Sequence, residues 1–534
     1  MKTFLSGNNR LGKLLLMMMF AAALLLRTSH ISGALEYDEI WSLENFSQLP
    51  VNEIFTRLSL PNNQVLNSLW IKTAAALNLP LTAIRLHSLA AGMLSILLAG
   101  FLAFVLSGRK RSAGIAAMLL LTFSAPDAVY AQLARGYSLQ VFFLALFSAG
   151  LAMDEEKIPG KAAIAAVFFG ALGAVFTLPT SAMYLALIAA GAVIIRKRLP
   201  SVPMLITLAA AGGISLLYMA LNYSELNAAR VWGTKITSVQ AFFRFCGTTL
   251  WAYLAGAAGA FSLYALFKMP GKVLPLAGII LFSLLTALLT NAGPLRAYIP
   301  FALLLAVSGG CGAALLEEKI PQRFKKAALV LLIVLLAGLY CRDFRQWHTP
   351  DWQEVFDACR NETQKVLVVH RATSGYPLLW NCGEEIVADL QGRMLSPESS
   401  RELLIFDLPG RLNGNDKNNC EVSLPLLPAG RSENVCGLDA VRYTMTRTLH
   451  PADGKAALVI LPPMEKASFT MLYDMLNGAF PDLTSLNPWL TGGVASKSAG
   501  ACGIYGFRPP EKNTFDWETF INASGGRALI YQIN

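Results

Sequence analysis

The chain has 534 residues, of which 54% are hydrophobic and only 15% are charged, and its formal net charge is +10. A soluble protein of this length carries roughly a quarter charged residues, so the composition excludes an ordinary soluble globular protein and indicates long lipid-facing segments. The positive charge does not indicate nucleic-acid binding. Lys and Arg fall in short clusters between apolar segments, and the sequence lacks zinc-finger, Walker-loop and basic-aromatic patterns.

The first apolar run covers residues 14–26, follows three basic residues and ends at Arg27. We interpret it as a membrane helix whose Arg27 snorkels to the outer interface. The alternative is a signal peptide with a cleavage site at residues 32–34. Both interpretations place Asp38, which follows, outside the cytoplasm.

Two adjacent carboxylates, Asp38 and Glu39, come directly after this run. Next to a membrane, such charges are either solvated loop residues or a functional site. A carboxylate can deprotonate an acceptor hydroxyl as a general base, or it can bind a hard divalent cation. The pair is therefore a candidate site for chemistry at the outer face.

Residues 38–80 mix apolar and polar side chains in the pattern of amphipathic helices lying in the membrane interface. Pro50 and Pro61 interrupt these helices. A further helix is expected to run from Val65 into the 70s.

Ten further apolar segments follow, and with the first they predict about eleven spans of the length that a hydrocarbon core of about 30 Å requires. They lie near residues 85–107, 113–130, 137–153, 162–178, 180–195, 203–221, 249–267, 273–290, 297–315 and 327–341.

Basic clusters occur at every second connection between these segments, which marks those connections as cytoplasmic. The clusters lie at residues 109–111, 157–161, 196–198, 268–272 and 319–326. The N-terminus is therefore predicted to lie on the cytoplasmic side of the membrane. An odd number of spans then places the C-terminal region outside.

The outer connections carry a few charged or aromatic residues of interest. Arg135 and Arg296 lie at outer ends of spans, where each needs an anion, and the planar fork of Arg suits a phosphate. For Arg135, snorkelling to lipid head groups is the alternative. Lys235 either closes over a phosphate or is solvated, Tyr298 is a site residue or an interfacial aromatic, and Asp127 caps a helix or joins the acidic site.

From Arg342 the composition changes to that of a soluble domain. We predict a membrane domain over residues 1–341 and an extracytoplasmic α/β domain over residues 342–534. Its expected strands include residues 366–369, 403–406, 457–461 and 527–533. Oxidising surroundings favour disulfides among the outer cysteines, with the pairing left open. These cysteines are Cys341, Cys359, Cys382, Cys420, Cys436 and Cys502.

Several strings in the first 340 residues occur in an order that resembles one known family. They are Asp38-Glu39, residues 62–66 leading to residues 85–92, Ala134-Arg135-Gly136-Tyr137 entering the fourth span, and residues 296–300. Together they resemble the motifs of the GT-C membrane glycosyltransferases, most closely bacterial relatives of protein O-mannosyltransferases and of the lipid A aminoarabinose transferase. Two positions depart from that pattern. Gln64-Val65 stands where the family has His-Pro, and Ala297 is inserted before Tyr298.

The resemblance implies an inverting transfer of one sugar from a polyprenyl phosphate to a lipid, envelope-glycan or protein acceptor at the outer face of the cytoplasmic membrane. It implies Asp38 as the base, with Glu39 beside it. The implied donor-phosphate ligands are Arg135, Tyr137, Arg296, Tyr298 and Lys235. Some members bind a divalent metal near the acidic pair, which makes Glu39 and Asp127 candidate metal ligands; no other cofactor is implied.

Three other functions fit a multi-span protein of this kind. A polyprenyl-linked glycan ligase or polymerase would transfer a finished chain. A transporter or flippase of envelope lipids predicts ionisable residues deep within spans and broken helices near the midplane. A membrane anchor for the outer domain predicts that Asp38 is dispensable. The spans here are nearly free of charge and the charges gather at their outer ends, which favours an interfacial enzyme.

Overall fold

A computed structural model describes residues 10–58, 63–155, 160–229, 257–289 and 298–347, together with seven strands of the C-terminal region. The contacts within the chain divide it into two units. A helical unit comprises residues 1–32 and 41–348, and a second unit comprises residues 33–40 and 349–534.

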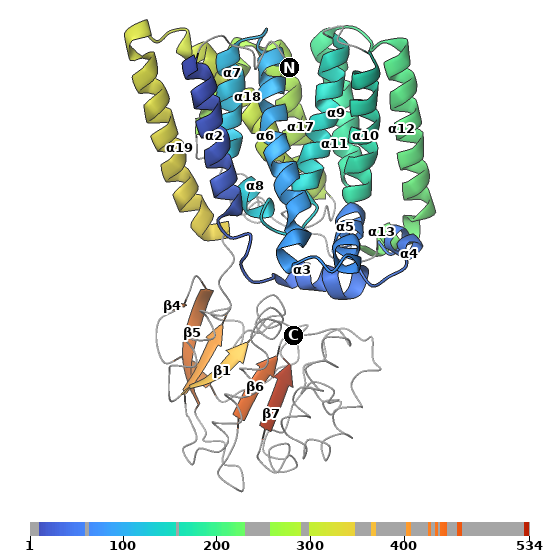
Figure 1. The fold of residues 1–534 in the computed structure, drawn as a ribbon, viewed down its shortest axis with the longest axis vertical. Coiled ribbons are helices and arrows are strands. Elements are labelled where there is room, and N and C mark those ends of the chain that lie inside the picture. The colour runs from blue at the N-terminus through green and yellow to red at the C-terminus, as the bar shows by residue number, and fades with distance from the viewer. Residues whose placement is uncertain are drawn as a thin grey trace. The chain divides into compact units, whose positions relative to one another are not determined.

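Figure 1 shows the described helices of the first 347 residues. In chain order they are α2 (Arg10–Thr28), α3 (Tyr37–Trp41), the π-helix η1 (Ser42–Phe46), α4 (Val51–Thr56), α5 (Val65–Ala76), the 3-10 helix η2 (Leu81–Arg85), α6 (Leu86–Leu106), α7 (Arg111–Thr122), α8 (Ala125–Tyr130), α9 (Tyr137–Glu155), α10 (Gly160–Thr177), α11 (Ser181–Arg196), α12 (Val202–Leu221), α13 (Tyr223–Ala228), α16 (Ala257–Lys268), α17 (Pro270–Leu289), α18 (Pro300–Glu317), the 3-10 helix η6 (Gln322–Phe324) and α19 (Lys325–Trp347).

The chain is a polytopic helical membrane protein. Within the described residues, 6 helices are long and apolar enough to cross a membrane. They are Leu81–Leu106, Tyr137–Asp154, Gly160–Thr177, Val202–Leu221, Pro300–Glu317 and Gln322–Phe344. Shorter apolar helices cover Leu16–Thr28, Arg111–Thr122, Ser181–Ile195 and Pro270–Ser283. Each predicted apolar segment except the one near residues 113–130 overlaps one described helix, although residues 249–256 lie outside the described residues. The count of about eleven spans stays a prediction.

The segment predicted as one span near residues 113–130 differs from the prediction, because it is two helices. α7 ends at Thr122 and α8 begins at Ala125. Ser124 between them has an extended backbone, and Pro126 occupies the first turn of α8. Proline suits the first turn of a helix because it has no N–H to leave unsatisfied, whereas inside a continuous helix it would remove a hydrogen bond. The chain therefore changes direction between α7 and α8.

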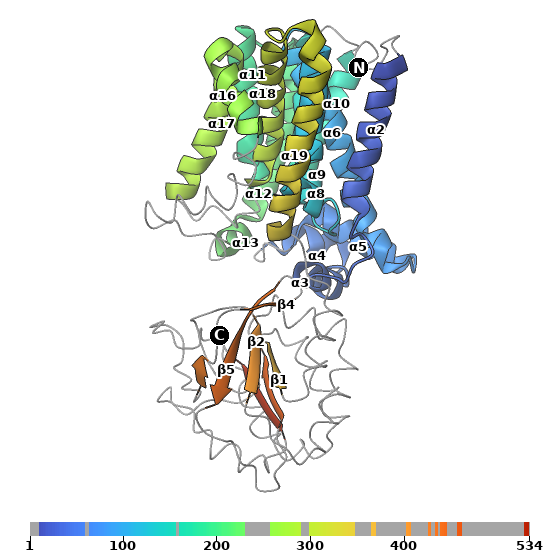
Figure 2. The same ribbon diagram turned by 90° about the vertical axis from the view of Figure 1, so that its left-hand side faces the viewer.

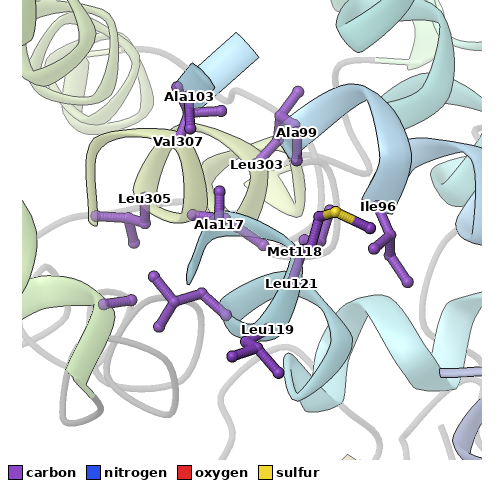
Figure 3. Close-up of a cluster of buried hydrophobic side chains, with 14 of the residues drawn as sticks. Ile96, Ala99, Ala103, Ala117, Met118, Leu119, Leu121, Leu303, Leu305 and Val307 are labelled. Carbon is purple, nitrogen blue, oxygen red and sulfur yellow. The ribbon is translucent and has the colours of Figure 1, made fainter. Parts of the chain in front are cut away.

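The core of the helical unit lies between α6, α7 and α18, whose side chains meet in one apolar cluster (Figure 3). Ala99 of α6, Met118 of α7 and Leu303 of α18 all belong to it. Small residues let these helices approach closely, as is typical of membrane bundles. A Cβ atom added at Gly310 would lie 2.5 Å from the carbonyl oxygen of Ala113. On the other side of α6, the helices α9, α10, α11 and α12 pack together (Figure 1).

Short helices gather at one end of this bundle, where α4, α5 and α13 lie and next to which α8 is found (Figures 1 and 2). The helix expected from Val65 is α5, so that prediction is confirmed. Ile54 of α4 packs against Val65 and Leu58 in a small apolar cluster of its own. The amphipathic pattern of this segment thus provides a partly apolar platform at that end of the bundle.

The second unit contains the described strands. They are β1 (Lys365–Val369), β2 (Glu402–Phe406), β3 (Leu426–Pro428), β4 (Glu433–Val435), β5 (Leu438–Met445), β6 (Ala457–Leu461) and β7 (Ala528–Gln532). One sheet has the order β1-β2-β5-β3, with β4 also paired to β5, and β6 pairs with β7. The β1–β2 and β6–β7 pairs are parallel, which requires crossover connections.

The strands expected near residues 366–369, 403–406, 457–461 and 527–533 coincide with β1, β2, β6 and β7. The helices expected between them fall outside the described residues, so the α/β class and the domain bounds stay predictions. Cys341 is an exposed free thiol, and the other outer cysteines also lie outside the described residues.

Candidate active site

The acidic pair lies in the first turn of α3, where carboxylates interact favourably with the helix dipole. Glu39 is fully buried, and its Oε2 accepts a hydrogen bond of 3.0 Å from the backbone N–H of Glu36. This contact is one half of a capping box, in which a side chain of the first turn accepts a hydrogen bond from the backbone N–H of the residue before the helix. It satisfies an N–H that the start of the helix would otherwise leave unpaired. Asp38 is only partly buried. Glu39 therefore has a structural task at the start of α3.

A π-helical turn, η1, follows α3 without a break, since Trp41, the last residue of α3, keeps a helical backbone. Such turns are rare and occur frequently at functional sites. Its first residue, Ser42, is fully buried. The hydroxyl of Ser42 lies 3.5 Å from Nη1 of Arg135, which brings this arginine to the start of η1.

Arg135 precedes α9 and is almost completely buried, with 1% of its surface exposed. Its guanidinium carbon lies 5.7 Å from the centre of the Tyr137 ring, within the range of a cation–π contact. Tyr137 is itself buried and packs edge-on against Tyr130, with ring centres 4.8 Å apart. An arginine that snorkelled to lipid head groups would expose its guanidinium, so that alternative for Arg135 is wrong.

The peptide group that joins Arg135 to Gly136 is clamped from both sides. Its carbonyl accepts a hydrogen bond of 2.9 Å from the hydroxyl of Ser88 in α6. Its N–H donates to Oε1 of Gln64, the residue before α5. A Cβ atom at Gly136 would lie 2.6 Å from Cγ2 of Thr177, so glycine is required there. The three sequence strings around Gln64, Ser88 and Arg135 therefore meet on one buried peptide.

A second layer of polar residues supports this clamp. Nε2 of His87 lies 2.8 Å from Oδ1 of Asn67 and 3.3 Å from the hydroxyl of Ser88, and so joins α5 to α6. The ring of His87 also packs against Trp70, with centres 5.7 Å apart. His87 lies at the start of an apolar segment of the sequence, near residues 85–107. Polar residues that interrupt apolar segments indicate such a network, but the sequence does not show which of them are partners.

Arg27 does not snorkel to the interface as predicted; it is fully buried. Its Nη2 lies 2.5 Å from Oδ2 of Asp127. Its two Nη atoms also donate to the carbonyls of Thr122 and Leu121, at 3.1 and 2.9 Å. Both carbonyls belong to the last turn of α7, where helical carbonyls lack their usual partners four residues on, and Arg27 donates to them there.

Asp127, predicted as a helix cap or a second acidic site residue, lies in the first turn of α8 and is fully buried. Burial raises the pKa of its carboxyl group, and the guanidinium of Arg27 opposes that rise. Its Oδ1 has no hydrogen-bond partner within the described part of the chain. The same part holds no group of three His, Cys, Asp or Glu side chains that could bind a metal ion.

The remaining predicted site residues divide into two groups. Arg296 and Lys235 lie outside the described residues. Tyr298 is described just before α18 and is 3% exposed. Its ring lies 5.4 Å from that of Phe301, within the apolar cluster that also contains Tyr184. Tyr298 is therefore packed inside the bundle, and the expectation of an interfacial aromatic at this position is wrong.

No protein-family model matches the chain, and no curated protein matches it. The structure is similar to crystal structures of ArnT from Cupriavidus metallidurans, a GT-C aminoarabinose transferase. The apo structure has a TM-score of 0.45 and 12% identity, and the structure bound to undecaprenyl phosphate has a TM-score of 0.44 and 11% identity. Each covers 81% of this chain and 98% of the ArnT chain.

Proposed function

We propose that this protein is an integral-membrane glycosyltransferase of the GT-C type. It transfers one sugar from a polyprenyl phosphate to an acceptor hydroxyl at the outer face of the membrane. The carrying observation is the buried Arg135, whose backbone is clamped by Ser88 and Gln64 at the end of the bundle where the short helices lie. A cation held this firmly in a membrane protein marks a functional site by default.

In the proposed reaction Asp38 takes the proton from the acceptor hydroxyl as its oxygen attacks the anomeric carbon. The bond between that carbon and the phosphate oxygen breaks, and the electron pair stays on the leaving polyprenyl phosphate. Arg135 stabilises the negative charge that develops there, since a preorganised donor costs no reorganisation at the moment of reaction. A single displacement from the side opposite to the leaving group inverts the anomeric configuration.

The residues that could hold a divalent metal do not fit such a role well. Glu39 accepts a hydrogen bond from its own helix, and one oxygen of Asp127 is paired with Arg27. A hard cation prefers several free oxygen ligands around it. We therefore assign Glu39 to shaping α3 and derive no step through a metal.

The decisive experiment is the change Asp38→Asn, with sugar transfer measured in nanodiscs under single-turnover conditions. Asparagine keeps the shape but is too weakly basic to accept the proton, so turnover should fall at least about a hundredfold while donor binding persists. Glu53→Gln is the matched control, because Glu53 is another acidic residue of the short helices and pairs with the exposed Arg57. Wild-type turnover in Asp38→Asn would reject the proposed base and favour an anchor or a transporter.

A further inference from the structure

A cavity of about 160 Å³ lies between α6, α9, α11, α17 and α18. Its walls are almost entirely aliphatic and include Leu106, Leu151, Ile188 and Leu276. The single charged residue in its lining is Lys272. Protein interiors contain few voids larger than a water molecule, and an apolar cavity of this size stays dry and takes up apolar ligands. The cavity therefore fits a segment of a hydrocarbon chain.

On one side of this cavity α11 and α17 approach each other closely, and several of their lining side chains are only partly covered by protein. Gly191 of α11 faces Pro275 of α17, and a Cβ atom added at Gly191 would lie 3.3 Å from Cβ of Pro275. Ile188, Pro275 and Leu276 are only partly buried, although they line the cavity. In a bilayer, the neighbours of such half-covered aliphatic side chains are lipid chains.

Lys272 gives the cavity one polar end. Its Nζ donates a hydrogen bond of 2.9 Å to the carbonyl of Leu106, the last residue of α6, which fixes the ammonium at that point. Nearby basic residues are already paired, as Lys110 lies 2.6 Å from Glu318 and Lys325 lies 3.0 Å from Glu317. Among the described residues Lys272 forms no such ion pair. An ammonium has three donors, so a phosphate oxygen can take another of them.

The cavity is remote from the proposed active site. Leu151 lines the cavity, whereas Arg135 precedes the first residue of α9, Tyr137. Fourteen residues of helix separate Tyr137 from Leu151, which is about 21 Å along α9. Lys272 also lies in a connection that the distribution of basic residues assigns to the cytoplasm. A phosphate bound at Lys272 thus belongs to a different molecule from one bound at Arg135.

We infer that this cavity binds one acyl chain of an anionic glycerophospholipid from the cytoplasmic leaflet, with its phosphate on Lys272. The aliphatic lining selects the chain, and the ammonium selects an anionic head group over a zwitterionic one. The site is independent of sugar transfer. An experiment that rejects this lipid site can therefore be distinguished from one that rejects the proposed sugar transfer.

The test is native mass spectrometry of the full chain in detergent, titrated with dioleoyl phosphatidylglycerol or dioleoyl phosphatidylcholine. The wild type should retain phosphatidylglycerol preferentially. Lys272→Gln should weaken that binding about tenfold and abolish the preference, because the amide can still donate to the Leu106 carbonyl but carries no charge. Lys268→Gln, at an exposed position in the same connection and outside the cavity, should bind like the wild type.

A second variant tests the cavity itself. Ala152 lines it from α9, and Ala152→Leu should fill part of its volume and weaken the binding of both lipids alike. Equal phosphatidylglycerol binding by wild type, Lys272→Gln and Ala152→Leu would overturn the inference. So would competition at this site by polyprenyl phosphate, since the occupant would then be the tail of the donor. Asp38→Asn should leave all of these affinities unchanged.

Discussion

At the scale of single residues, the buried arginines Arg27 and Arg135 have different environments. Arg27 is matched by a carboxylate and by two helix-terminal carbonyls. Arg135 has its backbone fixed by neighbouring helices and its guanidinium near a hydroxyl and an aromatic ring. The first arrangement resembles a structural ion pair. The second holds a planar donor group near the start of η1, and its shape matches that of a phosphate.

Arg135→Ala should therefore weaken donor binding at least about tenfold, because a charge-assisted contact to phosphate is lost. Arg135→Lys should restore part of the affinity, since a point charge cannot reproduce the fork. The measurement is the apparent affinity for a polyprenyl-phosphate sugar. Arg57→Ala serves as the control, because Arg57 is an exposed arginine of the short helices. Unchanged affinity in Arg135→Ala would remove this residue from the site.

Asp127→Ala should destabilise the protein by about 3–5 kcal/mol, because it leaves the guanidinium of Arg27 buried without its counter-charge. The double change Arg27→Met with Asp127→Leu should recover much of that loss. The control is Glu318→Ala, which breaks an exposed pair with Lys110 and should cost less than about 1 kcal/mol. Thermal unfolding in detergent compares the variants. An active, stable double variant would exclude Asp127 from catalysis, whereas a stable but inactive one would place it there.

At the scale of elements, the clamp on the Arg135–Gly136 peptide ties α5, α6 and the start of α9 together. Gly136→Ala should displace this peptide, because its new Cβ would lie 2.6 Å from Thr177 Cγ2 and 3.0 Å from Gln64 Oε1. We expect a higher KM for the donor with a smaller change in kcat, since the arginine moves but the base does not. Thr177→Ser in the same chain should relieve part of the effect.

The control for this change is Gly212→Ala in α12, where nothing lies within 4 Å of the added atom. It should be neutral or slightly stabilising, because Ala favours helices over Gly. A similar donor KM in Gly136→Ala and Gly212→Ala would show that the clamp does not position Arg135.

The sequence predicted the helices better than it predicted the site, for a physical reason. A run of about 20 apolar residues has to cross a bilayer, so each segment carries its own signal. The clamp has no local signal, because Gln64 and Gly136 are 72 positions apart and Ser88 and Arg135 are 47 apart. The sequence shows the charge of Arg27 at the end of an apolar segment. It does not show its partner Asp127 as a buried residue, because hydropathy alone does not reveal the break between α7 and α8.

At the scale of the whole molecule, the orientation in the membrane is still a prediction from the basic connections. A reporter fused after Leu199 should be cytoplasmic, and one fused after Asn534 should be external. Alkaline phosphatase and a fluorescent protein give opposite readouts on the two sides. A cytoplasmic reporter at Asn534 would reverse the assignment of the outer face and with it the place of the proposed reaction.

The pair between Arg27 and Asp127 also sets an order of events during synthesis. Its partners are 100 positions apart, so at about 5–20 residues per second the first helix waits roughly 5–20 s for its counter-ion. During that wait we expect Arg27 to lie at the membrane surface and to enter the bundle only after α8 has been inserted. Chains arrested before Cys246 contain no native cysteine. A thiol introduced by Leu26→Cys should therefore report the transition, with labelling by a water-soluble reagent falling once Asp127 has reached the membrane.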